Sequence, residues 1–193
     1  MSEQKTKFLD GIYSEFPELK TKELLDITDK DTFATLDDHL RAEFINFDHA
    51  KRTDLYRLSI MIEEHAQRAY QPLLATFETE HLYKYVEKRY LKILKNIPKA
   101  WIIGGFINPF FAPKTPPEKA EILTCAATNI EDMWIVVTKW SDGLFGLVAE
   151  DLGGVEKGDW FRGFFTTKND VIQKVIDQIN QTMSVNIDFS KPE

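Results

Sequence analysis

Three acidic side chains around one predicted strand end are the strongest candidates for chemistry in this sequence. Glu78 and Glu80 follow an apolar segment, and Glu63 lies beside the apolar stripe of the preceding helix. Alternation along an extended chain puts Glu78 and Glu80 on one side, as a general acid and a general base require. Glu80 is, however, expected to fall in the next helix. An enzyme that uses these carboxylates is one hypothesis, and it requires an acidic group with a perturbed pKa inside a cleft.

Motifs of the other common reaction classes are missing. Gly104 and Gly105 end a strand, but the Gly-Lys-Ser/Thr of a phosphate-binding loop does not follow. The sequence also has no His-Glu-x-x-His and no Gly-x-Ser-x-Gly. Cys125, the only cysteine, lies among small apolar residues, which favours a buried and inert thiol. We therefore predict no catalytic residue, no metal site and no cofactor, and a protein that is not an enzyme.

Aromatic residues follow two predicted strands at their C-terminal ends. Phe77 ends the first strand and Phe106 the second, and a proline-rich loop comes next. In open α/β sheets, ligands bind in the crevice beyond these strand ends. Most aromatic side chains are expected in the core, and a pocket that a few of them line is the functional alternative. The candidate ligand-binding residues are Phe77, Glu78, Phe106, Asn108, Phe110, Phe111 and Glu63.

A strand–helix–strand unit positions these candidates. We expect strands at residues 72–77 and 100–106, joined by a helix at residues 79–96 that Thr79 caps. The second strand has no polar side chain, which is typical of the middle of a sheet covered by helices on both faces. Such a unit is parallel and right-handed. The expected inner face of the helix comprises Leu82, Val86, Tyr90, Ile93 and Ile97.

The remaining segments predict an α/β fold. A helix is expected at residues 53–70 with Thr53 as its cap, and a hairpin at residues 133–150 with a three-residue loop that ends at Gly143. A last strand precedes a helix that begins with a capping box of Thr167 and Asp170. We predict a mixed, partly parallel central sheet with helices on both faces and an antiparallel hairpin in the second half. Residues 1–50 form a helical N-terminal extension, with a short strand around residues 42–47, and residues 51–193 the main domain.

Composition limits the classes of partner. The chain has 193 residues, of which 43% are hydrophobic and 12% aromatic, enough for a real core. Its net charge of −7 disfavours nucleic acid and anionic membranes as partners, because both are bound through excess Lys and Arg. The single cysteine fits a reducing compartment, and no apolar run approaches the ~20 residues that span a bilayer. We expect a cytoplasmic protein with no membrane and no nucleic-acid partner.

The order of segments resembles the DICT family, a sensory domain found in diguanylate cyclases and two-component systems. Leu58-Ser59 with Ile62-Glu63 resembles the family's "L-S-x-x-I-E" stretch. Similar blocks follow in order over roughly residues 53–183: a strand ending at Phe77, an aromatic helix, the apolar strand, the hairpin, and the closing strand and helix. The family's glutamine after the phenylalanine is Glu78 here. That difference puts any ligand or contact role of the amide in doubt.

The resemblance implies a non-catalytic sensory or regulatory module of bacterial signal transduction that acts through protein–protein interaction, with or without a small ligand in an aromatic pocket. The implied partner is a signalling protein such as a histidine kinase, a response regulator or a cyclic-dinucleotide enzyme, and self-association is a further alternative. A different hypothesis is a small-molecule-binding or nucleotide-binding α/β domain with a degenerate nucleotide-binding fold. The helix-flanked sheet and the aromatic strand ends motivate this second hypothesis.

Overall fold

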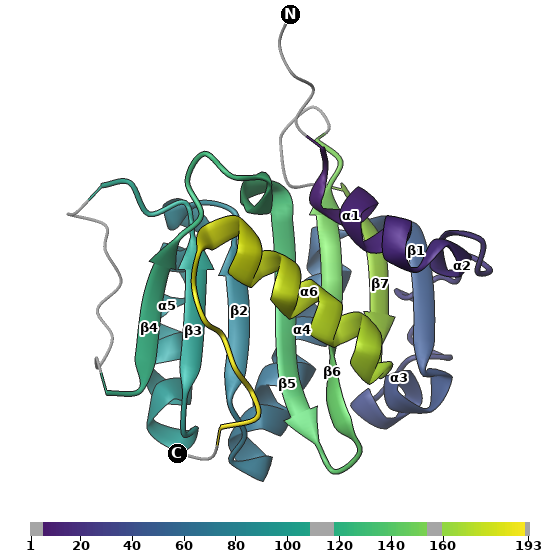
Figure 1. The fold of residues 1–193 in the computed structure, drawn as a ribbon. Helices are drawn as coiled ribbons and strands as arrows, with labels where there is room; N and C mark the ends of the chain where they lie inside the picture. The colour runs from purple at the N-terminus through teal and green to yellow at the C-terminus, as the bar shows by residue number, and fades with distance from the viewer. Residues whose placement is uncertain (1–5, 109–117, 154–159, 192–193) are drawn as a thin grey trace, which may run out of the picture.

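A seven-stranded mixed sheet runs through the middle of the protein (Figure 1). The computed structural model describes residues 6–108, 118–153 and 160–191. The strand order is β1-β7-β6-β5-β2-β3-β4. The strands are β1 (Phe44–Lys51), β2 (Leu73–Phe77), β3 (Ala100–Gly104), β4 (Ala120–Thr124), β5 (Met133–Trp140), β6 (Gly143–Asp151) and β7 (Trp160–Thr166).

Strand direction divides the sheet into two parts. The strands β2, β3 and β4 are parallel to one another, and Leu73 pairs with Ala100 at the start of this block. On its other side β2 pairs antiparallel with β5, and the pairs β5–β6, β6–β7 and β7–β1 are antiparallel as well. The predicted mixed, partly parallel α/β sheet is therefore confirmed. The direction changes at β2, which lies between its parallel partner and an antiparallel strand that is distant in the sequence.

Helices cover both faces of the sheet, as predicted. Figure 1 shows α4 and α5 behind the sheet and α1 and α6 in front of it. Two apolar clusters fill these two layers, one around Leu58 and Tyr90 and the other around Phe164 and Val175. The helices are α1 (Phe8–Glu15), α2 (Pro17–Lys20), α3 (Leu36–Ala42), α4 (Arg52–Ala69), α5 (Glu80–Ile93) and α6 (Asn169–Met183), with short 3-10 turns at Leu94–Asn96 and Asn129–Asp132.

The expected cap of α5 is confirmed, and its expected inner face is confirmed in part. The Thr79 hydroxyl accepts a 3.3 Å hydrogen bond from the backbone N–H of Leu82. Tyr83 and Tyr90, two turns apart, are the fully buried aromatic residues of this helix. Of the five residues expected on the inner face, Tyr90, Ile93 and Ile97 are buried, whereas Leu82 and Val86 are half-buried and line a cavity beside α4.

Two predicted helix caps are wrong. Thr53 lies inside α4, whose N-cap is Lys51, and Thr167 precedes Lys168, the N-cap of α6; neither N-cap accepts a side-chain hydrogen bond. Both helices are instead held by packing. The α6 face is buried at Val171, Ile172, Val175, Ile176 and Ile179, as its spacing predicts.

Two predicted strand boundaries also shift. Trp140 pairs with Gly143, so the hairpin loop contains the two residues Ser141 and Asp142 rather than three. The positive φ expected at Gly143 is present, at 135°. β3 ends at Gly104 rather than at Phe106, because the chain turns there and the Gly104 carbonyl accepts the backbone N–H of Phe106 at 2.8 Å.

The N-terminal region joins the sheet as well as covering it. α1 packs against α6, where the Gln178 side chain donates a 2.7 Å hydrogen bond to the Phe8 carbonyl oxygen. The strand expected around residues 42–47 is longer, and β1 pairs antiparallel with β7 from Phe44 to Lys51. Residue 50, the predicted end of the extension, lies within this strand.

Candidate functional site

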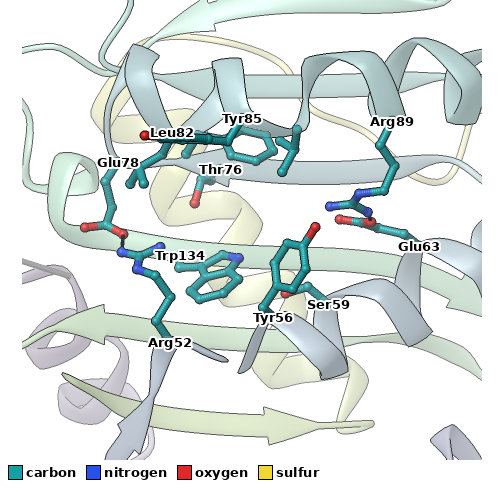
Figure 2. A pocket seen from close by; sticks show the side chains of 12 residues that line it. Arg52, Tyr56, Ser59, Glu63, Thr76, Glu78, Leu82, Tyr85, Arg89 and Trp134 are labelled. Carbon is teal, nitrogen blue, oxygen red and sulfur yellow. Dashed lines mark hydrogen bonds and ion pairs between the residues drawn. The ribbon is translucent and has the colours of Figure 1, made fainter. Parts of the chain in front are cut away.

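A cavity of about 280 Å³ lies between α4 and α5, over β2 and β5, and we call it the α4–α5 pocket. It is located at the point in the sheet where strand direction changes. Figure 2 shows side chains from both helices and from the sheet converging on it. The lining residues are Arg52, Tyr56, Ser59 and Glu63 from α4, Thr76 and Phe77 from β2 with the following Glu78, Leu82, Tyr85, Val86 and Arg89 from α5, and Trp134 from β5.

An ion pair closes one end of the pocket. Arg52, the first residue of α4, donates a 2.7 Å hydrogen bond from Nη2 to Glu78 Oε1 just after β2 (Figure 2). The guanidinium also lies 5.2 Å from the Trp134 ring and 5.0 Å from the Phe161 ring. Such cation–π contacts fix the orientation of an arginine side chain. The carboxylate of Glu78 and the indole of Trp134 are thus joined through Arg52.

Glu78 titrates near neutral pH. Only 4% of this residue is exposed. Burial raises the pKa of the carboxyl, and the neighbouring Asp151 carboxyl raises it further, while the hydrogen bond and the charge of Arg52 lower it. The balance moves the pKa from 4.5 to about 7. Glu78 therefore exchanges a proton in the pH range where cells work.

A second ion pair closes the other end of the pocket. The Glu63 carboxylate, 2% exposed, accepts a 2.6 Å hydrogen bond from the Tyr90 hydroxyl at Oε1 and pairs with Arg89 at Oε2. Burial raises the pKa of Tyr90 above its ordinary value, so the hydroxyl remains a donor. The Arg89 guanidinium lies 5.3 Å from the Tyr56 ring. Both oxygens of Glu63 are therefore engaged by residues of α5.

Two polar atoms of the lining have no protein partner. The Ser59 hydroxyl oxygen and the Arg89 Nε atom are both buried, and neither takes part in a hydrogen bond. Buried donors are rarely left unpaired, because desolvation without a partner costs about 1–3 kcal/mol. Both atoms belong to pocket-lining residues at the end where Glu63 lies. They are the polar groups that a ligand would satisfy.

The structure brings three of the sequence-predicted residues together in this pocket. Glu63, Phe77 and Glu78 line the pocket. Phe106 does not line it, and instead packs in the core with its ring 5.7 Å from that of Tyr83. Asn108 contributes its backbone N–H, which donates a 3.1 Å hydrogen bond to Glu80. Phe110 and Phe111 lie outside the described residues.

The position of the pocket differs from the expected crevice. It lies over the face of β2 and β5 between two helices, not beyond the ends of β2 and β3. Glu80 does not line it, because its carboxylate turns back to accept the backbone N–H groups of Ile107 and Asn108. The hypothetical Glu78–Glu80 acid–base pair is therefore not assembled in this pocket.

Sequence reasoning missed the two arginines and most of the aromatic wall. Arg52, Tyr56, Ser59 and Glu63 recur at spacings of three or four residues, the spacing of one helical face. That spacing was a signal for the α4 wall, but it needed the correct helix start at residue 52. Trp134 had no comparable signal, because only the placement of β5 beside β2 brings it to the pocket.

Cys125 has no part in this site. It is fully buried just after β4, and burial, with the nearby charges of Glu131 and Asp132, raises the pKa of its thiol to about 12. This agrees with the inert thiol expected from the sequence.

Comparisons of the chain with protein-family models, with curated proteins and with solved structures return no match. In the part of the chain that the structure describes, no group of three or more His, Cys, Asp and Glu side chains is arranged to hold a metal ion. Within the same residues, no helix combines the length and the apolar character needed to cross a bilayer.

Proposed function

We propose that this protein is a non-catalytic sensory or regulatory module whose input is a small molecule bound in the α4–α5 pocket. The observation that carries the proposal is the pocket itself, a cavity with aromatic walls and an Arg–Glu pair at each end. Ligand sites in proteins have this composition, with mostly apolar walls and a few polar groups that fix orientation. Two buried donors without partners inside it further favour a ligand.

A bound ligand would act on the relative position of α4 and α5. These helices contact each other through Glu63, which receives both the Tyr90 hydroxyl and the Arg89 guanidinium. A molecule between Tyr56 on α4 and Val86 on α5 would add contacts that depend on the separation of the helices. A ligand shifts a conformational equilibrium by its difference in affinity for the two states. The outer surface of α4 and α5 would then report occupancy.

The proposed receiver of this signal is another protein. The "L-S-x-x-I-E" stretch and the segments that follow it resemble the DICT family. This resemblance supports a cytoplasmic signalling partner, such as a histidine kinase, a response regulator or a cyclic-dinucleotide enzyme. That stretch places Ser59 and Glu63 on the pocket wall. The family-like segment and the candidate ligand site therefore coincide on α4.

Ligand screening combined with partner capture tests the proposal. A thermal-shift screen of metabolites should give stabilising compounds, since a ligand at 100 times its Kd adds about 2.7 kcal/mol. Val86→Trp, which fills the pocket from a half-buried position, should abolish the shift. Lys88→Trp, an exposed position on the same helix, is the matched control.

The tagged chain should capture a signalling protein from its native cells, and Val86→Trp should alter that capture where Lys88→Trp does not. A screen without hits, together with no captured signalling protein and wild-type behaviour of a deletion strain, would contradict the proposal.

A degenerate nucleotide-binding site has less support. The N-terminus of α5, where phosphate would bind, is flanked by the carboxyl groups of Glu78 and Glu80, and the Thr79 hydroxyl caps it. The cavity of about 280 Å³ is also slightly smaller than typical ligand sites of ~300–1,000 Å³, so a dinucleotide would remain largely outside. Nucleotides in the same thermal-shift screen test this alternative directly.

An acid–base enzyme is a second candidate function, which one observation favours. Glu78 is a buried carboxyl that lines the pocket, and its pKa is raised to about 7. An acidic group with a perturbed pKa inside a cleft is what general acid–base catalysis requires. In that case Glu78→Gln would abolish conversion of a bound compound while leaving its affinity intact. Unchanged turnover by Glu78→Gln, or no conversion of any binding compound, would dismiss this candidate.

A further inference from the structure

We infer that the ligand of the α4–α5 pocket is a small aromatic carboxylate, with its ring against the aromatic wall and its carboxylate on Ser59 and Arg89. This inference rests on the proposed function and specifies the chemistry of its input. It follows from three properties of the pocket: its volume, the shape of its walls, and the kind of polar group left unpaired.

The volume favours a ligand whose buried part is a single or fused ring with one substituent. The cavity of about 280 Å³ lies just below the ~300–1,000 Å³ of typical ligand sites. Ligand sites bury most of the surface of their ligand. Tetrapyrroles and cyclic dinucleotides are larger than this space, whereas a substituted benzene or indole fits within it.

The walls favour a flat, apolar body. Trp134 of β5 is 8% exposed and contributes its ring to the floor of the pocket, and Phe77 adds a second ring from the end of β2. Tyr56 and Tyr85 remain 39% and 88% exposed. Large aromatic side chains left exposed beside one cavity are surface that a planar ligand can cover, with ring centroids ~4.5–7 Å apart. Figure 2 shows Tyr85 and Tyr56 on opposite helices around the pocket.

The unpaired polar atoms favour an acceptor at the Glu63 end. Arg89 Nε can only donate, and the Ser59 hydroxyl can donate. Both are buried without a hydrogen-bond partner. The two oxygens of a carboxylate could accept from both donors, and hydrogen bonds to a charged acceptor are roughly twice as strong as neutral ones. A ligand that ends in a carboxylate would therefore satisfy the two unpaired donors that belong to the residues lining this pocket.

A cationic ligand fits this end less well. Both oxygens of Glu63 already face donors, the Tyr90 hydroxyl and the Arg89 guanidinium, and Glu78 is held by Arg52 at the other end. A cation would have to displace an arginine from a buried carboxylate, which leaves a charge unpaired. An anion displaces neither, because it uses the edge of the guanidinium that Glu63 does not occupy.

Paired acid and amide probes test the inference. The probes are 4-hydroxybenzoate and indole-3-acetate, with 4-hydroxybenzamide and indole-3-acetamide as neutral counterparts, and Kd is measured by calorimetry and by saturation-transfer NMR on the full chain. At least one acid should bind about tenfold or more tightly than its amide, since a hydrogen bond to a charged group is worth about 1.5–3 kcal/mol.

Matched variants separate a binding role from a structural one. Ser59→Ala and Arg89→Lys should each raise the Kd of the acid by roughly tenfold and change the Kd of the amide little. Ser59→Ala should fold normally, because its hydroxyl has no partner to lose, and Arg89→Lys keeps the positive charge beside Glu63. Arg68→Lys, at an exposed position of α4, should leave both affinities unchanged.

The outcomes distinguish this inference from the proposed function. The inference of an aromatic carboxylate is overturned if acid and amide bind with equal affinity. It is also overturned if Ser59→Ala and Arg89→Lys bind the acid as tightly as the wild type does. If other compounds still bind and Val86→Trp abolishes their binding, the sensory pocket survives with a different ligand class. If no compound binds and Val86→Trp leaves partner capture unchanged, the proposed function itself fails.

Discussion

The Tyr90 hydroxyl lies 2.6 Å from Glu63 Oε1, and this hydrogen bond joins α5 to α4 at one end of the pocket. Both residues are almost fully buried. Arg89, next to Tyr90 in the sequence, pairs with the other carboxylate oxygen. A buried carboxylate is stable only when its oxygens have such partners. The two helices that form the pocket are therefore positioned by one acidic side chain.

Removal of the Tyr90 hydroxyl should destabilise the protein. Tyr90→Phe leaves Glu63 Oε1 buried without its donor, at a cost of about 1–3 kcal/mol in the free energy of unfolding. Tyr83→Phe is the matched control, because the Tyr83 hydroxyl is buried and has no hydrogen-bond partner. Its loss should be neutral or slightly stabilising. Urea unfolding curves measure both variants, and equal effects would show that the Tyr90–Glu63 bond contributes nothing specific.

Glu78 should make stability depend on pH between 4.5 and 7. In this interval the folded protein holds a proton on Glu78 that the unfolded chain has released, because folding raises the pKa from 4.5 to about 7. The contribution of Glu78 is therefore largest at the acidic end and falls as pH rises, by up to about 1.4 kcal/mol per pH unit. The difference between wild type and Glu78→Gln, from urea unfolding at several pH values, should show this slope. A difference that is constant or rises with pH would contradict it.

Gly163 in β7 should not tolerate a side chain. Its φ is 151°, and a Cβ atom there would lie 2.0 Å from the Val148 carbonyl oxygen of β6. Gly163→Ala should lower the free energy of unfolding by more than about 2 kcal/mol, because strand backbone must move. Gly153→Ala is the control, with a φ of 80° but no neighbouring atom within 4 Å. Its cost should be about 1 kcal/mol, from the backbone alone, and similar losses in both variants would exclude the steric explanation.

The Cys125 thiol should resist modification in the folded state. A rise of its pKa from 9.0 to about 12 lowers the thiolate fraction at pH 8 by about a thousandfold, and the residue is fully buried. Reaction with Ellman's reagent should therefore be slow in native protein and fast in 6 M guanidinium chloride. Rapid native reaction would show that the segment after β4 opens readily.

The local pattern of apolar residues was sufficient to predict the main helices and strands of this fold. Apolar periodicity placed the helices at residues 79–96 and 53–70 and the face of α6, and the apolar strand through Ile102 was correctly expected inside a covered sheet. These features depend on residues close in the sequence, because burial of one face imposes a period of 3.6 or 2. Helix caps were less predictable: Thr79 is a cap and Thr53 is not, although both precede an apolar stripe.

Tertiary structure decided the position and composition of the pocket. The sequence alone placed Glu63, Phe77 and Glu78 among the candidates, since they lie on or beside the parallel unit. Arg52 and Trp134 became pocket residues only because β5 inserts antiparallel next to β2, which brings Trp134 under the first turn of α4. Pairing of strands some sixty residues apart depends on how whole layers pack. The local periodicity of apolar residues does not predict such a pairing.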